Sequence, residues 1–160
     1  MIPDAAPTAD RANRYPWPPI IYVVALAAAF VLDRLVPIWP RGFDPELYHV
    51  DEVLILAGLV IAFSGFFYFQ FIGTPFDPTG SAKALATGGI YKWTRNPMYL
   101  GALVFFVGFG LAFDSGWLLA AVLPIGFALQ KLAIGPEEAY LTRRFGDAYV
   151  AYCRQVRRWV

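Results

Sequence analysis

The sequence predicts an all-α membrane protein with about four transmembrane helices, and two features of its composition favour this class. Hydrophobic residues make up 58% of the 160 residues and charged residues only 16%, whereas a soluble domain normally carries about a quarter charged residues. A chain of this length forms one domain, not two. Its apolar residues exceed what one small core can bury, so lipid must cover the remainder.

The apolar residues fall into four runs. A helix that spans a membrane needs about 20 such residues. The first two runs cover residues 18–39 and 53–73. The third and fourth cover 98–113 and 117–134, and only Asp114–Gly116 separates them. We therefore expect a tight helical hairpin. Its first helix is short for a full crossing, so it is tilted into a thin region or stops before the far surface.

The segments outside the spans differ in character. Residues 1–17 contain three prolines and no apolar run, so we expect a disordered tail followed by a single domain over 18–160. Gly135–Pro136 is expected to break the fourth span, and an amphipathic helix is expected over 137–156, bent near Gly146–Asp147. The apolar face of that helix recurs at steps of three or four, which suits a helix along the membrane surface or packed on the bundle. Its members are Leu141, Phe145, Tyr149, Tyr152 and Val156.

Lys and Arg set the expected orientation. Of the 13 basic residues, all except Arg34 and Arg41 fall in the N-terminal tail, in the loop between the second and third spans, or in the C-terminal tail. The positive-inside rule then places both termini and the loop Thr74–Pro97 in the cytoplasm. An even number of spans keeps these segments on one side, which supports four. The bacterial inner membrane is the expected location, and the same charge asymmetry would also fit an endoplasmic reticulum orientation.

Several kinds of site are disfavoured by the sequence. A net charge of +1 offers no nucleic-acid footprint, and the basic tail is better suited to anionic lipid head groups. Cys153 has no partner for a disulfide within the chain and is interpreted as an inert, packed thiol. His49 is expected on the opposite side of the membrane from the polar segments described next. No zinc-ligand spacing, phosphate-binding loop or Ser-His-Asp arrangement is present, so no metal is expected.

The segment Thr87–Gly101, TGGIYKWTRNPMYLG, is unusually polar for a membrane loop. Pro97 begins the third span where its missing N–H is harmless, and Asn96 is a natural N-cap. Arg95 and the free N–H groups of this helix start form a suitable site for a carboxylate or phosphate. The simpler interpretation is a well-capped helix with interfacial Arg and Tyr anchors.

Glu137 and Glu138 follow the fourth span directly. Acidic residues in a first helical turn suit the helix dipole, which is the simpler explanation. Two adjacent carboxylates at the membrane boundary cannot both face solvent easily. One of them is therefore expected to point toward the protein and to need a cationic or hydrogen-bonding partner.

Together these segments resemble the isoprenylcysteine carboxyl methyltransferase-like and phospholipid methyltransferase-like membrane enzymes. The family pattern is G-x-Y-x-x-x-R-H/N-P-x-Y-x-G, a hairpin, and then E-E-x-x-L-x-x-x-F-G-x-x-Y-x-x-Y. Asn96 stands where the eukaryotic carboxyl methyltransferases have His. This departure leaves the implied cofactor binding in place, but the substrate need not be a prenylcysteine. The resemblance covers the C-terminal part of the chain from Thr87 onward, and every fixed position is met: Gly89, Tyr91, Arg95, Asn96, Pro97, Tyr99, Gly101, Glu137, Glu138, Leu141, Phe145, Gly146, Tyr149 and Tyr152.

The resemblance implies an enzyme that uses S-adenosylmethionine as cofactor. By resemblance, the catalytic candidates are Glu138, Arg144 and Tyr149. Arg95 and the helix-start N–H groups would hold the cofactor carboxylate, a Glu would accept from its ammonium or ribose, and aromatic faces would lie by its adenine or sulfonium. The implied cofactor-binding residues are Gly89, Tyr91, Arg95, Asn96, Pro97, Tyr99, Leu100, Gly101, Glu137 and Glu138.

The methyl acceptor stays open between a carboxylate, an amine and a thiol. An amine or thiol must lose a proton, which a Glu or Tyr can take. A carboxylate needs no base, and Arg144 could orient it. The acceptor is expected to be lipophilic and to enter from the bilayer. The glycines of the second and third spans suit either a substrate groove or close helix packing, and packing is the simpler interpretation.

Two other functions are compatible with part of the sequence. A sterol-reductase-like enzyme would share a related C-terminal pocket but bind NADPH, whose 2′-phosphate demands more basic residues. A non-catalytic membrane subunit would need no cofactor at all and would leave the Arg-Asn-Pro and Glu-Glu groups as helix caps. Cofactor binding to purified protein separates the three.

Overall fold

The computed structural model describes residues 15–38, 48–73 and 84–160, and in these ranges the ordered elements are all helical. The all-α prediction is therefore confirmed. Most of the predicted N-terminal tail, Trp39 and Lys83 lie outside the described residues. The elements are α1 (Trp17–Leu35), α2 (Tyr48–Phe71), the 3-10 turn η2 (Gly89–Lys92), α3 (Pro97–Ala112), α4 (Gly116–Leu129), the π-helical turn η3 (Gln130–Ile134), α5 (Gly135–Phe145) and α6 (Asp147–Gln155).

Three helical stretches of the described chain are long and apolar enough to cross a membrane: α1, most of α2, and the continuous stretch Gly116–Phe145. The protein is an integral membrane protein. Helix α3 is apolar but has only 16 residues. At 1.5 Å per residue it is about 24 Å long, less than the about 30 Å of hydrocarbon in a bilayer. The short third span expected from the sequence is thus confirmed.

Two helix boundaries differ from the prediction. Helix α1 ends at Leu35, before the predicted end of the first span, because Pro37 disfavours helical backbone in the residue ahead of it. Helix α2 begins at Tyr48 instead of residue 53, so His49 and Asp51 lie in its first turn and not in a loop. An acidic side chain in that turn suits the positive end of the helix dipole. Polar residues therefore begin a helix whose apolar part starts later.

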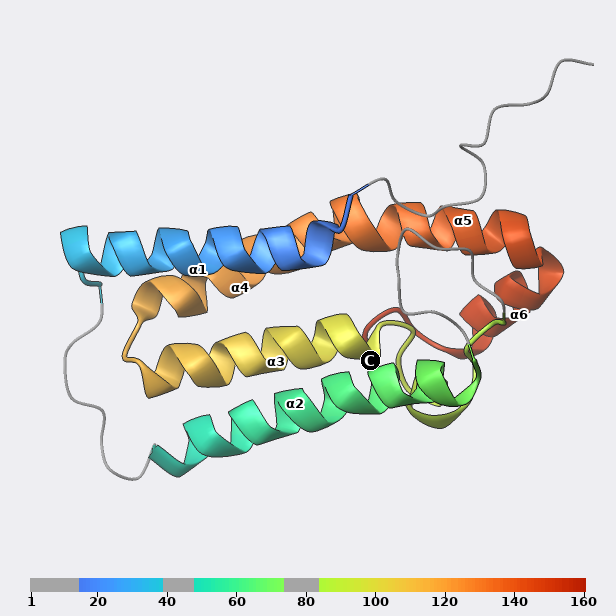
Figure 1. The fold of residues 1–160 in the computed structure, drawn as a ribbon, viewed down its shortest axis with the longest axis horizontal. Coiled ribbons are helices and arrows are strands. Elements are labelled where there is room, and N and C mark those ends of the chain that lie inside the picture. The colour runs from blue at the N-terminus through green and yellow to red at the C-terminus, as the bar shows by residue number, and fades with distance from the viewer. Residues whose placement is uncertain (1–14, 39–47, 74–83) are drawn as a thin grey trace, which may run out of the picture.

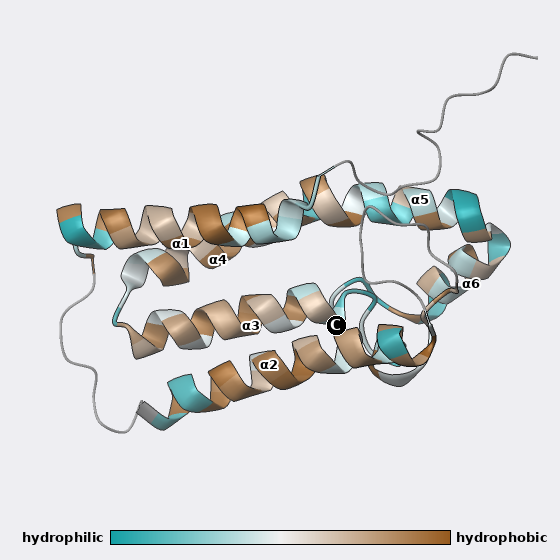
Figure 2. Cartoon of the chain, viewed as in Figure 1, coloured by the Kyte–Doolittle hydropathy of each residue, from teal (hydrophilic) through white to brown (hydrophobic). Residues whose placement is uncertain are grey.

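The helices alternate in direction (Figure 1). Helix α2 packs along α3, and α4 contacts both α1 and α3. The start of α1, the end of α2 and the start of α3 consequently lie at one end of the bundle, together with α5 and α6. Colouring by hydropathy shows the same division, because α1–α4 are mostly hydrophobic and α5–α6 are mostly hydrophilic (Figure 2).

The predicted hairpin between the third and fourth spans is present. Ser115 is the N-cap of α4, and its hydroxyl accepts from the Leu118 N–H at 3.1 Å. The same hydroxyl donates to the carboxylate of Asp33 at the end of α1. The Trp117 indole N–H donates to the Val36 carbonyl at 2.7 Å. The turn is therefore tied to α1, which fixes three helices at this end of the bundle.

The predicted break at Gly135–Pro136 is wrong, because the helix continues from Gly116 to Phe145. The π-helical turn η3 replaces the break, and the Gly135 N–H bonds the Gln130 carbonyl five residues earlier. A wider turn of this kind accommodates the missing N–H and the ring of Pro136 without ending the helix. Glu137 and Glu138 are therefore carried on a rigid extension of α4.

The predicted C-terminal helix is interrupted at Gly146, which has φ +53° and separates α5 from α6. The bend was expected from the sequence, and it divides the segment into two helices. The apolar face does not lie free along a membrane surface. Tyr149, Tyr152 and Val156 are buried in a cluster with Tyr91, and Leu141 and Phe145 pack against it. The C-terminal helices are thus part of the folded core.

Small residues allow α2 and α3 to pack closely. A Cβ placed on Gly58 would lie 2.5 Å from the Phe105 backbone nitrogen, and one on Gly101 would lie 2.5 Å from backbone atoms of Ala62 and Gly58. Neither backbone can move aside as a side chain could. These glycines are therefore required by helix packing, as in membrane bundles generally.

We predict that Gly58→Ala lowers the thermal unfolding midpoint in detergent by about 5 °C, because overpacking against backbone costs about 2 kcal/mol. The matched control is Gly126→Ala on α4, where the nearest atom would lie at an ordinary 3.7 Å. The control should leave the midpoint unchanged or raise it slightly. Equal midpoints for the two variants would contradict this account of the α2–α3 contact.

Candidate functional site

The polar residues singled out by the sequence gather where α3 begins and α5 leaves the bundle (Figure 1). The loop before α3 contributes Tyr91, Arg95 and Asn96, and α5 contributes Glu137 and Glu138. The hairpin of α3 and α4 brings the two segments together, as expected from the sequence.

The glycines of the loop are explained by packing against α2. Gly89 has φ +55°, a conformation that L side chains rarely adopt. A Cβ on either Gly88 or Gly89 would also collide with the side chain of Tyr68. The two glycines therefore let the η2 turn sit against α2, and that turn positions Tyr91.

Tyr91 is buried and held on both sides. Its ring lies 5.6 Å from the ring of Tyr68 and 5.4 Å from that of Phe69, between centroids. Its carbonyl accepts from the Tyr152 hydroxyl at 2.7 Å. The Tyr91 hydroxyl is buried and has no hydrogen-bond partner among the residues that the structure describes. Burial raises its pKa above the ordinary value, and the nearby charge of Glu137 adds to this. Tyr91 is therefore a neutral donor with no acceptor.

Asn96 occupies the N-cap position of α3, as predicted, but its side chain does not cap the helix. Its amide nitrogen donates instead to the carbonyl of Arg158 at 3.0 Å. Thr94 bonds the same carbonyl at 3.1 Å and accepts from the Asn96 N–H at 3.2 Å. The Arg95 N–H bonds the carbonyl of Arg157 at 3.1 Å. The C-terminal backbone thus binds the Asn96 side chain that was expected to cap α3, together with the Thr94 hydroxyl and the Arg95 N–H.

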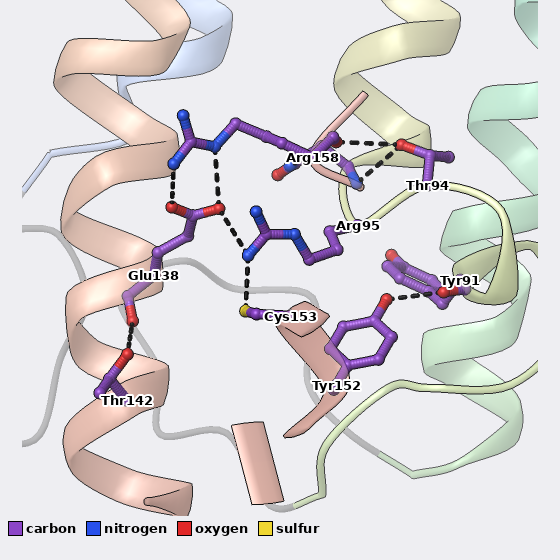
Figure 3. Close-up of polar contacts among 9 residues, drawn as sticks. Tyr91, Thr94, Arg95, Glu138, Thr142, Tyr152, Cys153 and Arg158 are labelled. Atoms are coloured by element: carbon purple, nitrogen blue, oxygen red, sulfur yellow. Dashed lines mark hydrogen bonds and ion pairs between the residues drawn. The ribbon is translucent and has the colours of Figure 1, made fainter. Parts of the chain in front are cut away.

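A carboxylate shared by two guanidiniums lies at the centre of the site (Figure 3). Arg158 approaches Glu138 with two nitrogens, Nε to Oε1 at 3.0 Å and Nη2 to Oε2 at 2.6 Å. Arg95 Nη1 lies 3.2 Å from Glu138 Oε1. The Arg95 and Glu138 side chains are only 13% and 17% exposed. These ion pairs are shielded from solvent and fix both side chains.

Arg95 makes one contact that the sequence did not predict, and one of its guanidinium nitrogens is buried without an acceptor among the described residues. Its Nη1 donates to the Cys153 sulfur at 2.6 Å, so this cysteine lies inside the polar cluster and is more than a packed thiol. Its Nε is buried and has no hydrogen-bond partner in residues 15–38, 48–73 and 84–160. Arg95 and Tyr91 therefore each leave one buried donor without an acceptor. Buried donors of this kind are rare and need an explanation.

The two adjacent carboxylates have different surroundings. Glu138 is engaged by Arg95 and Arg158, whereas Glu137 accepts one hydrogen bond, from the Tyr99 hydroxyl at 3.3 Å. Tyr99 lies in the first turn of α3. One of the two carboxylates was expected to point into the protein, and in the structure both do. Glu137 can accept more further hydrogen bonds than Glu138.

The remaining predicted residues occupy varied positions. Pro97 is fully buried and Leu100 half-buried in the first turn of α3, while Gly101 faces α2. Tyr149 is buried beside Tyr152, and burial together with the charge of Glu138 raises its pKa, so its phenol stays protonated. Arg144 is exposed on α5.

Arg158 lies beside Glu138, although the sequence did not indicate it as a site residue. It stands in a run of basic residues near the end of the chain, a pattern typical of a lipid-contacting tail. Thr94 and Cys153 were not predicted as site residues either, because neither is a fixed position of the family pattern. Only the folding of the tail across the start of α3 identifies them.

The chemistry of the site suits a polar organic ligand. Within the described residues, no group of His, Cys, Asp and Glu side chains could hold a metal ion. The arrangement instead offers guanidinium and phenol donors beside a carboxylate acceptor. A ligand that carries both a carboxylate and an ammonium, such as the amino-acid part of S-adenosylmethionine, matches this set.

Comparison with known proteins identifies one family model and two partial relatives that the chain resembles. Residues 49–148 match the phospholipid methyltransferase family. A Protein-S-isoprenylcysteine O-methyltransferase of Schizosaccharomyces pombe is 34% identical over 74 residues, which cover 45% of this chain and 30% of that protein. An uncharacterized protein of Haemophilus influenzae is 32% identical over 63 residues, covering 39% of this chain and 100% of that protein. The chain thus spans less than a third of the Schizosaccharomyces relative. No solved structure matches it.

We predict that Glu138→Gln destabilises the fold, because Arg95 and Arg158 would then face each other without a shared anion. Breaking a shielded pair costs about 2 kcal/mol after allowance for its partial exposure. Thermal unfolding in detergent measures this cost. Glu52→Gln, on the exposed face of α2, removes the same charge and should leave the midpoint unchanged. A loss of equal size in both variants would argue against the shared ion pair.

Proposed function

The chain belongs to the phospholipid methyltransferase family, and we propose that it transfers a methyl group from S-adenosylmethionine to a lipophilic acceptor at the cytoplasmic membrane face. The acceptor atom belongs to a carboxylate, an amine or a thiol. The observation that carries the proposal is the pair of buried donors without partners, the Tyr91 hydroxyl and Arg95 Nε, beside the carboxylates of α5.

Arg95 and Tyr91 are proposed to hold the cofactor carboxylate. A buried donor gains most from a charged acceptor, and a carboxylate can accept from both groups at once. Glu138 supports this role indirectly, because its ion pair keeps the Arg95 guanidinium in place. The N–H groups at the start of α3 add a favourable partial charge for an anion.

Glu137 is proposed to accept from the cofactor ammonium or ribose hydroxyls. Its carboxylate has one hydrogen bond, from Tyr99, and so retains capacity to accept. The Tyr99 ring lies beside this carboxylate, and an aromatic ring suits a sulfonium or ammonium cation. The contrast between the two carboxylates favours Glu137 for ligand contact and Glu138 for holding Arg95.

S-adenosylmethionine supplies an activated methyl group, and its transfer by in-line displacement needs no metal. The chain's own contribution is alignment of the reactants and exclusion of water. An amine or thiol acceptor must lose a proton, and Glu137 is the carboxylate best placed to take it. A carboxylate acceptor would need no base. Tyr149 is a poor base, since its raised pKa keeps the phenol protonated.

Access from the bilayer is supported by the outer faces of the bundle. Large apolar side chains such as Val23 and Phe30 on α1 and Phe63 and Phe67 on α2 are more than half exposed. A lipid environment covers such surfaces, and the polar site lies at one end of the same helices. A hydrophobic acceptor can therefore approach sideways with its reactive group at the membrane boundary.

The cytoplasmic orientation is supported by charge. At the end of the bundle that holds the site, α5, α6 and the residues after them carry several exposed arginines, among them Arg143, Arg144 and Arg154. In the described residues of the opposite end, Arg34 closes α1. The positive-inside rule then favours cytoplasmic termini, which puts the site on the side where the cofactor is made. The bacterial inner membrane is the membrane that we propose.

We expect purified protein in detergent to bind S-adenosylmethionine saturably by calorimetry and not to bind NADPH. Arg95→Ala, Glu137→Gln and Glu138→Gln should each weaken binding by at least about tenfold, the usual cost of losing a charge-assisted contact. Arg34→Ala and Glu52→Gln remove like charges elsewhere and should bind normally. Tight NADPH binding, or wild-type affinity in all three site variants, would refute the proposal.

A second expectation concerns the acceptor. With radiolabelled S-adenosylmethionine and protein in lipid vesicles, label should pass into organic-extractable product and not into short-chain, water-soluble analogues that carry the same reactive group. The reason is that burial of each CH₂ contributes about 0.8 kcal/mol to partition into the bilayer. Parallel assays with carboxylate, amine and thiol acceptors identify the reactive atom. Equal labelling of the soluble analogues would exclude lateral access.

A further inference from the structure

The five residues after α6 cross the start of α3 and do not extend as a free tail. The chain end lies beside the start of α3 in Figure 1. Val156 is buried in the Tyr91 cluster, and Trp159 packs against the separate apolar core to which α1, α3 and α4 contribute. Arg158 lies between these two anchors. The segment Val156–Val160 is called the C-terminal strap below.

The Arg158 side chain reaches α5. Its paired hydrogen bonds to both Glu138 oxygens have the bidentate geometry that gives Arg–carboxylate pairs their orientation as well as their energy. The side chain is 36% exposed, and the bond to Glu138 raises its pKa. Glu138 also contacts Arg95, so the two arginines are linked through one carboxylate.

The Arg158 carbonyl reaches the loop before α3. It accepts from the Asn96 amide and from the Thr94 hydroxyl, and the preceding carbonyl of Arg157 accepts from the Arg95 N–H. These three bonds fix backbone and side chains on both sides of Arg95. Arg158 therefore binds α5 through its side chain and the loop before α3 through its carbonyl.

Contact with lipid head groups does not account for this arrangement. An arginine that serves anionic lipid extends toward solvent, as the exposed Arg154 and Arg157 can do. Arg158 instead directs its guanidinium at a carboxylate that is 17% exposed. Desolvating that pair is costly unless its geometry is maintained. The pair is thus a fixed part of the site.

We propose that Arg158 is a positioning residue of the cofactor site: through Glu138 it holds the Arg95 guanidinium, and the C-terminal strap thereby completes the site. The inference rests on the proposed function, because Arg95 is taken to contact the cofactor carboxylate. Without the Arg158 guanidinium, Glu138 is free to rotate about its side-chain bonds and draws Arg95 with it. The donor at Arg95 Nε then loses its fixed direction.

The test compares Arg158→Gln, Arg158→Lys and the control Arg154→Gln. Arg154 closes α6 and is exposed, so its substitution removes the same charge without touching Glu138. Binding of S-adenosylmethionine is measured by calorimetry on monodisperse protein, beside the thermal midpoint. Arg158→Gln should weaken binding by about tenfold or more, the usual cost of removing a partner that orients a ligand-contacting group. Lysine restores the charge but not the two-point geometry, so it should recover part of the loss.

A double-mutant comparison separates positioning from general stabilisation. If Arg158 acts through Glu138, then Arg158→Gln combined with Glu138→Gln should weaken cofactor binding no more than Glu138→Gln alone. In steady-state assays, Arg158→Gln should raise the KM for S-adenosylmethionine and leave the KM for the acceptor unchanged. A merely structural role would lower the amount of active protein and move neither KM.

The outcomes distinguish the two proposals. If the unchanged chain binds no S-adenosylmethionine, the proposed function fails and this inference with it. If the unchanged chain binds the cofactor and Arg158→Gln binds it equally well, only the inference is overturned. Additive losses in the double variant would also overturn it. Should Arg158→Gln fail to fold, Arg158→Lys keeps the charge, and full wild-type affinity in that variant would exclude the two-point geometry.

Discussion

The carboxylate of Glu138, held between Arg95 and Arg158, joins three parts of the chain that are distant in sequence. Arg95 belongs to the loop before α3, Glu138 to the helix after α4, and Arg158 to the C-terminal strap. A carboxylate shielded at a membrane boundary needs its charge compensated, and two guanidiniums do this here. The direction of the Arg95 donors depends on this ion pair, because it fixes the guanidinium, whereas Tyr91 is placed by its packing on α2 and Asn96 by its bond to the Arg158 carbonyl.

The helix bundle serves this cluster by setting the direction from which each residue arrives. Close packing of α2 on α3, made possible by Gly58 and Gly101, brings the loop against Tyr68 and turns Tyr91 inward. The π-helical turn at Gln130–Ile134 lets α4 continue past Pro136, so Glu137 and Glu138 extend from the bundle on a rigid helix. A broken helix at this point would leave both carboxylates on a flexible connection. Rigid support of this kind is what alignment-based methyl transfer requires.

Much of the fold follows from local pattern. Long apolar runs indicate the membrane helices, the short spacer at Asp114–Gly116 indicates the hairpin, and the glycine at position 146 indicates the bend before α6. Errors arose where two local signals compete. Gly-Pro normally ends a helix, but the π-helical turn before Gly135 lets the helix continue past Pro136. Asn before Pro normally caps a helix, yet the Asn96 amide found the Arg158 carbonyl instead.

The sequence by itself determined that this protein lies in the membrane, that its polar residues gather at one end, and that two segments match a methyltransferase pattern, because hydropathy, charge and motif spacing are properties of short stretches. The tertiary structure alone decided how the surroundings of the two carboxylates differ and that Arg158 lies beside Glu138. Glu137 and Glu138 are neighbours of the same type, and only their partners, Tyr99 on one side and two arginines on the other, distinguish them. Such partnerships join residues far apart in the chain, and no local pattern records them.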